Sequence, residues 1–395
     1  MRPAWAGTAR RAVGVVVAVA ALAATSCTNA TADDEAAPSA GDAELAGTPQ
    51  RVGATGQRAV PGLDRDAGVS ARLRDGSVVW FFGDTGVRNP DGTMKFFTIG
   101  SAAWAPPSRP TRPEDYVTAG QTVPFLSSQD GFPPCPDGYP NPGVWPLAAV
   151  TVPAGAEDRV LLFMGNTCLA NGPAATSRGV SVAEWRYRPG TRPTDGPLQV
   201  TVLNPSLFPD GRYGTAATLG PDGWLYAYGC GIVPLPDTPA REVPCQAARV
   251  RPGKVADPGA YAPWDGSRWT VGANPAVLEM APLDDGPSNP PGPFSVAFDP
   301  GRRQWLMAYS PWPGYVPLGV VRAAASPQGP WGPPSEFRLP DCSDGLSDPV
   351  RACYGVNLQP WRSTGDQIGV GWYDRSVPGT AQRGAFLVSG LQVGD

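Results

Sequence analysis

Gly68-Val-Ser-Ala-Arg-Leu73, the turn Asp75-Gly76 and Val78-Val-Trp-Phe-Phe82 form the stretch that decides the fold. Short runs rich in Val and aromatic residues on either side of an Asp-Gly turn predict an antiparallel β-hairpin. The same pattern of strand, glycine-containing turn and strand recurs at intervals of roughly 50 to 70 residues. The four further copies are 145–151 with 159–164, 213–218 with 224–228, 294–298 with 304–309, and 354–358 with 367–372.

Repetition of one unit favours an all-β, five-bladed β-propeller whose blades are antiparallel sheets. Further strand-like segments, such as 181–187 and 319–323, extend the units into meanders. The fifth unit lacks one strand, and Gln50-Arg-Val-Gly-Ala54 is expected to supply it and close the ring. A two-sheet sandwich is the main alternative fold. No segment of the mature chain reads as a convincing helix. The long loops 105–144 and 256–291 are candidates for binding.

The N-terminus reads as an export signal. Arg2, Arg10 and Arg11 precede an apolar run, residues 12–24, that is too short to span a bilayer and typical of a signal-peptide core. Ala24-Thr25-Ser26-Cys27 resembles a lipobox, in which Cys27 would be lipidated. The alternatives are an ordinary signal peptide cleaved nearby and, with less support from the residues, twin-arginine export.

Composition divides the rest of the chain into a stalk and one domain. Residues 28–49 are poor in large apolar side chains, so we expect a flexible stalk there. Residues 50–395 contain aromatic residues throughout and form the single propeller domain. The net charge of −4 and the absence of a basic tract after the signal give no footprint of nucleic-acid binding. We expect an exported monomer that contacts a membrane only through a lipid anchor at Cys27.

Seven cysteines become six once Cys27 is set aside, an even number that favours disulfides in an exported chain. Fifteen connectivities are open for six cysteines. Proximity in the sequence suggests Cys135–Cys168, Cys230–Cys245 and Cys342–Cys353. Structural zinc is the weaker alternative, because the chain has neither a Cys-x-x-Cys pair nor a histidine. We expect no metal and no cofactor.

The chain contains no histidine, which excludes Ser-His-Asp and Cys-His catalysis and a histidine general base. Hydrolysis would therefore depend on carboxylates, Tyr, Lys or Arg. Asp66 and Asp84 flank the first hairpin at equal distances from its tip at Asp75. Residues so placed lie opposite each other, about 5 Å apart in the backbone. In a propeller this places both at the mouth of the central cavity, where paired carboxyls can share acid and base roles. The competing interpretation is two aspartates that only cap turns.

The order Asp-x-Gly, strand, turn, strand and Phe82-Gly-Asp-Thr85 resembles the opening blade of the five-bladed propeller family first catalogued as domain of unknown function 4185. Further matches, across residues 50 to 393, include 213–214 with 224–226, 294–298 with 305–306, 324–331 and 354–360. Some members of that family are endo-D-arabinanases acting on cell-envelope arabinan. The resemblance implies that Asp66 and Asp84 are paired catalytic carboxylates. The chain departs from the family pattern at Ala67 and in the loop 105–144.

Polar and aromatic residues at strand ends are expected to face the same cavity and bind sugar hydroxyls. They are Asn141, Trp145, Asn166, Arg212, Tyr213, Asn289, Tyr354 and Asn357. Trp224, Trp305 and Trp372 lie in mid-strand and are expected in the core. Glu184 is a possible third carboxylate, although a solvated strand face suits it better.

Two functions follow from these observations. The first is an exported glycoside hydrolase, endo-acting on arabinofuranose polymers such as the D-arabinan of the cell envelope. The second is a non-catalytic carbohydrate-binding or scaffold lipoprotein, since a propeller fold does not fix a function.

Overall fold

The computed structural model describes residues 50–54 and 63–392, except for short stretches within that range. The exceptions are 67, 90, 92, 116, 119–120, 127–128, 130, 172–174, 194–197, 231–243, 284–289, 291, 312–313, 315, 340–341, 343–352, 366 and 375–384. The predicted signal peptide, Cys27 and the predicted stalk lie outside the described residues.

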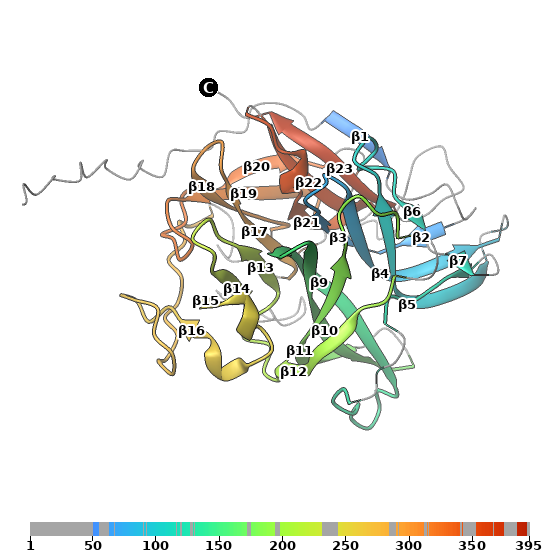
Figure 1. Ribbon diagram of the computed structural model, residues 1–395, viewed down its shortest axis with the longest axis horizontal. Coiled ribbons are helices and arrows are strands. Elements are labelled where there is room, and N and C mark those ends of the chain that lie inside the picture. The colour runs from blue at the N-terminus through green and yellow to red at the C-terminus, as the bar shows by residue number, and fades with distance from the viewer. Residues whose placement is uncertain are drawn as a thin grey trace, which may run out of the picture. The chain divides into compact units, whose positions relative to one another are not determined.

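Five antiparallel sheets are arranged around a centre, which confirms the five-bladed propeller and excludes the sandwich (Figure 1). Blade 1 contains β2 (Leu63–Arg65), β3 (Gly68–Arg72), β4 (Val78–Arg88), β5 (Met94–Ala105) and β6 (Glu114–Asp115). Blade 2 contains β9 (Asn141–Ala154), β10 (Glu157–Leu169), β11 (Ala175–Tyr187) and β12 (Thr201–Phe208). A small separate hairpin joins β7 (Val117–Thr118) to β8 (Gln121–Thr122).

The other three blades are built from shorter strands. Blade 3 contains β13 (Ala216–Leu219), β14 (Leu225–Cys230), β15 (Cys245–Val250) and β16 (Ala262–Pro263). Blade 4 contains β17 (Phe294–Asp299), β18 (Gln304–Tyr309), β19 (Leu318–Ala324) and β20 (Ser335–Arg338). Blade 5 contains β21 (Cys353–Leu358), β22 (Gln367–Asp374), β23 (Ala385–Gln392) and β1 (Gln50–Ala54).

The ring closes as the sequence predicts, because β1 pairs with β23 and completes blade 5 from the other end of the domain. All five predicted hairpins are present. The third begins later than expected, at Ala216, because Tyr213 is buried in the core before the strand starts. Within the described residues the only helical segments are three short 3-10 turns, Pro252–Lys254, Pro258–Ala260 and Pro360–Arg362.

The core lies between the blades, where alternate side chains of each sheet pack against the neighbouring sheet. Val79 and Phe81 of β4 pack with residues of blade 2, whereas Val78, Trp80 and Phe82 pack with residues of blade 5. One strand therefore joins two cores. This packing fixes β4 firmly at the point where its buried part ends and Gly83-Asp84 begins.

Candidate functional site

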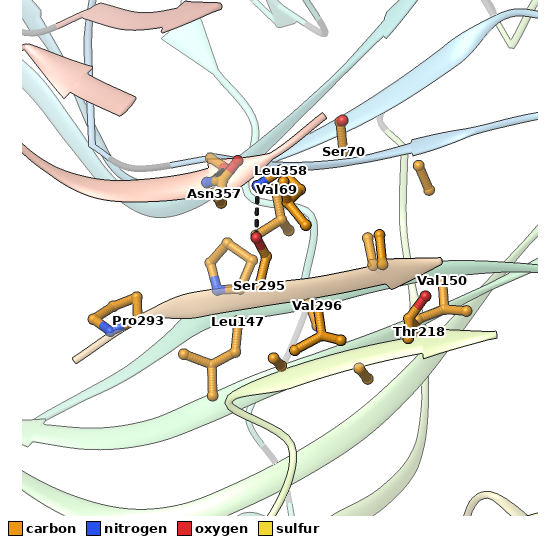
Figure 2. A pocket seen from close by; sticks show the side chains of 18 of the residues that line it. Val69, Ser70, Leu147, Val150, Thr218, Pro293, Ser295, Val296, Asn357 and Leu358 are labelled. Atoms are coloured by element: carbon orange, nitrogen blue, oxygen red, sulfur yellow. Dashed lines mark hydrogen bonds between the residues drawn. The ribbon is translucent and has the colours of Figure 1, made fainter. Parts of the chain in front are cut away.

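The innermost strands β3, β9, β13, β17 and β21 surround a cavity of about 670 Å³. Their labels lie around the centre of Figure 1. Most of the wall is apolar, with side chains such as Val69, Leu147 and Val296 from three different blades (Figure 2). Asp66, Trp145 and Tyr354 line the cavity where the inner strands begin, and Ser70 and Trp361 line it farther along. The polar groups are thus few and are held by a rigid apolar scaffold.

Asp66 and Asp84 form a pair, as the hairpin spacing predicts. The backbone N–H of Asp66 donates to the carbonyl of Asp84 at 2.7 Å. The neighbouring pairs, Gly68 with Phe82 on β3 and Arg65 with Thr85 on β2, fix the same register. Both aspartates are half-buried. Two short strands, β2 and β3, bind the same long strand β4 on either side of Asp66, and this arrangement sets the pair at the cavity end.

The Asp84 carboxylate turns toward blade 2. Its Oδ1 accepts a hydrogen bond of 2.8 Å from Nε1 of Trp145, which lines the cavity. Simple alternation would direct Asp84 to the blade 5 side with Phe82. The direction changes across Gly83, which lies opposite Gly100 on β5, and Gly100 has a left-handed φ of 79°. The two glycines thus explain how the carboxylate reaches Trp145.

Burial raises the pKa of Asp84 above its ordinary value, and the hydrogen bond from Trp145 opposes part of that rise. Asp66 has a different environment. Its Oδ1 accepts a 2.5 Å hydrogen bond from the hydroxyl of Tyr354 on blade 5, and a donated hydrogen bond favours the ionised form of a carboxyl group. The two carboxyl groups therefore differ in a way that suits one as a proton donor and the other as an anion.

Three of the eight residues predicted to bind sugar lie on the cavity: Trp145, Tyr354 and Asn357. Asn357 is only 9% exposed, and its amide is used within the protein. It donates to the carbonyls of Gly68 and Gly355 and accepts from Gln359. Asn357 thus ties the inner strand of blade 5 to that of blade 1 beside Asp66.

Four other predicted residues are not among those that line the cavity, because each takes another partner. Asn141 is exposed and donates to Asn171, and Arg212 pairs with Asp210 on the surface. Asn166 is buried against Ser181 and Pro205, and Tyr213 packs on Phe208. Strand ends in a twisted blade point in several directions, which the linear sequence does not reveal. Asn289 lies outside the described residues.

The remaining candidates are structural. Trp305 and Trp372 are buried, as expected. Trp224 is half-buried beneath the guanidinium groups of Arg249 and Arg251. Glu184 is not on a solvated face, since it is 9% exposed and is held by Arg159 and Arg186, whose hydrogen bonds lower its pKa against the effect of burial.

Sequence reasoning missed a polar group farther along the cavity. Ser70 donates to Gln359, and the indole of Trp361 donates to both. Gln359 is 1% exposed, so this network is internal. A Gln-Pro-Trp sequence after a strand resembles an ordinary turn, and only the closure of the ring brings it to Ser70. The network binds blade 5 to blade 1 for a second time.

All three suggested disulfides are present: Cys135–Cys168, Cys230–Cys245 and Cys342–Cys353. Cys230 and Cys245 are cross-strand partners in blade 3. Three disulfides are consistent with an extracellular location. No helix in the described part of the chain is long and apolar enough to cross a membrane.

The fold and the site define the class: an all-β, five-bladed propeller with a carboxyl pair at one end of its central cavity. Residues 177–371 match the family described as "Domain of unknown function (DUF4185)", which confirms the resemblance seen in the sequence. No curated protein matches the chain significantly.

Solved structures share the fold. A presumed hydrolase from Bacteroides ovatus has 18% identity and a TM-score of 0.56, and the alignment covers 84% of this chain and 86% of that one. A thermostable family-43 glycoside hydrolase has 12% identity and a TM-score of 0.46, over 85% and 92% of the two chains. An N-acetylgalactosamine deacetylase from F. plautii has 9% identity and a TM-score of 0.49, over 88% and 95%.

Proposed function

We propose that this protein is an exported glycoside hydrolase that cleaves arabinofuranose polymers of the cell envelope internally, with Asp66 and Asp84 as its catalytic carboxyl groups. The observation that carries the proposal is the backbone pairing of these two aspartates at one end of the cavity, each with its own hydrogen-bond donor from another blade. The polymer and the endo mode rest on the family resemblance, and the solved structures contribute the fold alone.

Asp84 is assigned as the general acid. Burial favours its protonated form, so it can donate a proton to the leaving oxygen of the glycosidic bond. The ionised Asp66 carboxylate then either attacks the anomeric carbon or removes a proton from the attacking water. Analysis of the anomer released first distinguishes these two roles, because a nucleophile retains the configuration and a general base inverts it.

The site includes no group that must be supplied from outside the chain. Tyr354 holds Asp66 from blade 5, and Trp145 holds Asp84 from blade 2. Each carboxyl group is therefore kept in place from the side away from the other's partner. Lipid attachment at Cys27 after export remains part of the proposal, and it would place the enzyme at the outer surface of the membrane.

The test is digestion of purified arabinan by the purified protein, with separation of the released oligosaccharides. Asp84→Asn and Asp66→Asn should each lower the rate by at least ~100-fold, since proton transfer contributes on that scale. Asp257→Asn is the matched control, because Asp257 only caps a 3-10 turn in blade 3. Circular dichroism melting curves should overlay for all four proteins.

Two results would contradict the proposal. One is full activity in Asp84→Asn or Asp66→Asn. The other is binding of arabinan by the wild-type protein without any new reducing ends, which would instead favour the non-catalytic carbohydrate-binding function.

A further inference from the structure

An apolar strip leads away from Asp84 along blade 1. In the register of β4 and β5, Asp84 is opposite Ile99 and Gly86 is opposite Phe97. Residues two apart on a strand share a face, so Asp84, Gly86, Phe97 and Ile99 lie on one face. Met94 belongs to the same face, because a Cβ placed on Gly86 would lie 2.8 Å from the Met94 sulfur. We call Met94, Phe97 and Ile99 the apolar strip.

The opposite face of this hairpin is packed. Leu63 and Val87 are buried there, with Phe96 against them. The strip, in contrast, reaches solvent at its outer end, where Met94 is 45% and Phe97 is 48% exposed. Among the described residues the other large apolar side chains that are exposed are Val271 and Val277, which lie between β16 and β17. An exposed apolar strip of this kind marks an interaction surface more often than scattered single residues do.

The strip is continuous with the carboxyl site. Its inner end, Ile99, is directly opposite Asp84 and lies within contact distance of the position above Gly143 of β9, two residues before Trp145. Five residues of extended strand, from Ile99 to Phe97 and on to the level of Met94, span roughly 17 Å. That length exceeds one sugar ring and suits a run of several.

We propose that the apolar strip binds the sugar chain of the substrate on one side of the bond that is cleaved. Sugar rings carry apolar C–H faces that pack on aromatic and thioether groups, and a neutral glycan needs no charge here. This inference rests on the proposed function and adds its substrate subsites: a polymer would contact Phe97 and Met94, while a short oligosaccharide held at Asp66 and Asp84 would not.

Phe97→Ala tests the strip. Loss of one aromatic contact should lower kcat/KM on arabinan by ~10-fold and on the shortest oligosaccharide cleaved by less than ~2-fold. Phe97→Leu, which keeps an apolar side chain, should fall between wild type and Phe97→Ala. Val277→Ala is the matched control, since it also truncates an exposed apolar side chain and should change neither rate. An equal loss on both substrates, or no loss on arabinan, would overturn the proposal.

Binding separates failure of the strip from failure of the enzyme assignment. Migration of Asp84→Asn and of the double variant Asp84→Asn/Phe97→Ala is compared in native gels that contain arabinan. Retardation of the first protein and free migration of the second supports the strip even if the wild type cleaves nothing. Equal retardation of both, or retardation of neither, overturns it.

Discussion

Blades 1 and 4 start from the same hairpin and end differently. In blade 4 the inner pair β17 and β18 has six residues in each strand, and Tyr309 closes it in the core with its hydroxyl bonded to buried Arg322. In blade 1 the strand that pairs with the innermost one, β4, has 11 residues and continues past the core. Two positions beyond the first inner pair, blade 1 carries Asp66 and Asp84, whereas blade 4 carries Gly292 and Pro311.

The comparison separates the parts of the hairpin that fold from the parts that act. Both hairpins bury a continuous apolar face, and that burial holds the ring together. Only blade 1 extends its strands into the space at the end of the cavity, and the extension contains the paired carboxyl groups and the apolar strip. Function therefore lies in an extension of one repeat, so changes there should alter activity more than they alter the ring.

The largest effect should come from breaking the turn of direction at Gly100. A Cβ there would lie 2.5 Å from a ring carbon of Phe125, in a residue whose φ of 79° disfavours any side chain. We expect Gly100→Ala to lower the free energy of unfolding by ~2–4 kcal/mol and to abolish most arabinan cleavage, because Asp84 loses its position. Urea denaturation and the digestion assay measure both effects.

Gly155→Ala provides the control for that substitution. Gly155 also has a positive φ, of 63°, but nothing lies within 4 Å of the added Cβ. Its loss of stability should be about 1 kcal/mol and its activity unchanged. If the two variants lose the same activity, the turn at Gly100 does not position Asp84.

A smaller effect should follow from Trp145→Phe, which removes the indole N–H donated to Asp84. That hydrogen bond lowers the pKa of Asp84 against the effect of burial, so its loss should raise this pKa further. A general acid acts in its protonated form, and the alkaline limb of the profile of kcat/KM against pH should therefore move to higher pH. Trp361→Phe, which changes an indole elsewhere on the same cavity, should leave the limb in place. A shift of the Trp145→Phe limb to lower pH would contradict the assignment of Asp84 as the acid.

The blades could be predicted from the sequence because their physical cause is local. Alternating apolar residues around a glycine turn specify a hairpin, and five hairpins in series leave few ways to bury their faces. The closing strand 50–54 and the pairing of Asp66 with Asp84 follow from the same logic of counting and register. The three disulfides were suggested by proximity alone, and proximity worked because each joins strands or loops that follow one another closely.

The environment of the site could not be predicted, because it depends on contacts between blades. The donors to Asp66 and Asp84 come from Tyr354 and Trp145, which are 288 and 61 residues away. Asn166 and Tyr213 failed as cavity residues for the reverse reason, since neighbouring strands bury them. The reversal at Gly83 and Gly100 is equally hidden, because a glycine in a strand does not announce its φ.

The smallest effect is expected at the opposite tip of blade 1. Asp75 accepts hydrogen bonds from the Tyr187 hydroxyl and the Gly190 N–H of blade 2, and together with Ser77 these lower its pKa despite partial burial. A carboxyl whose pKa is lower in the folded state stabilises the protein above its unfolded pKa, and this stabilisation is lost as the pH falls through the folded value. Asp75→Asn should therefore cost about 1 kcal/mol near pH 7 and progressively less in acid, measured by urea denaturation at several pH values. Arabinan cleavage should be unchanged. A large loss of activity in Asp75→Asn would show that both ends of blade 1 serve the reaction and would remove the contrast between the extension and the ring.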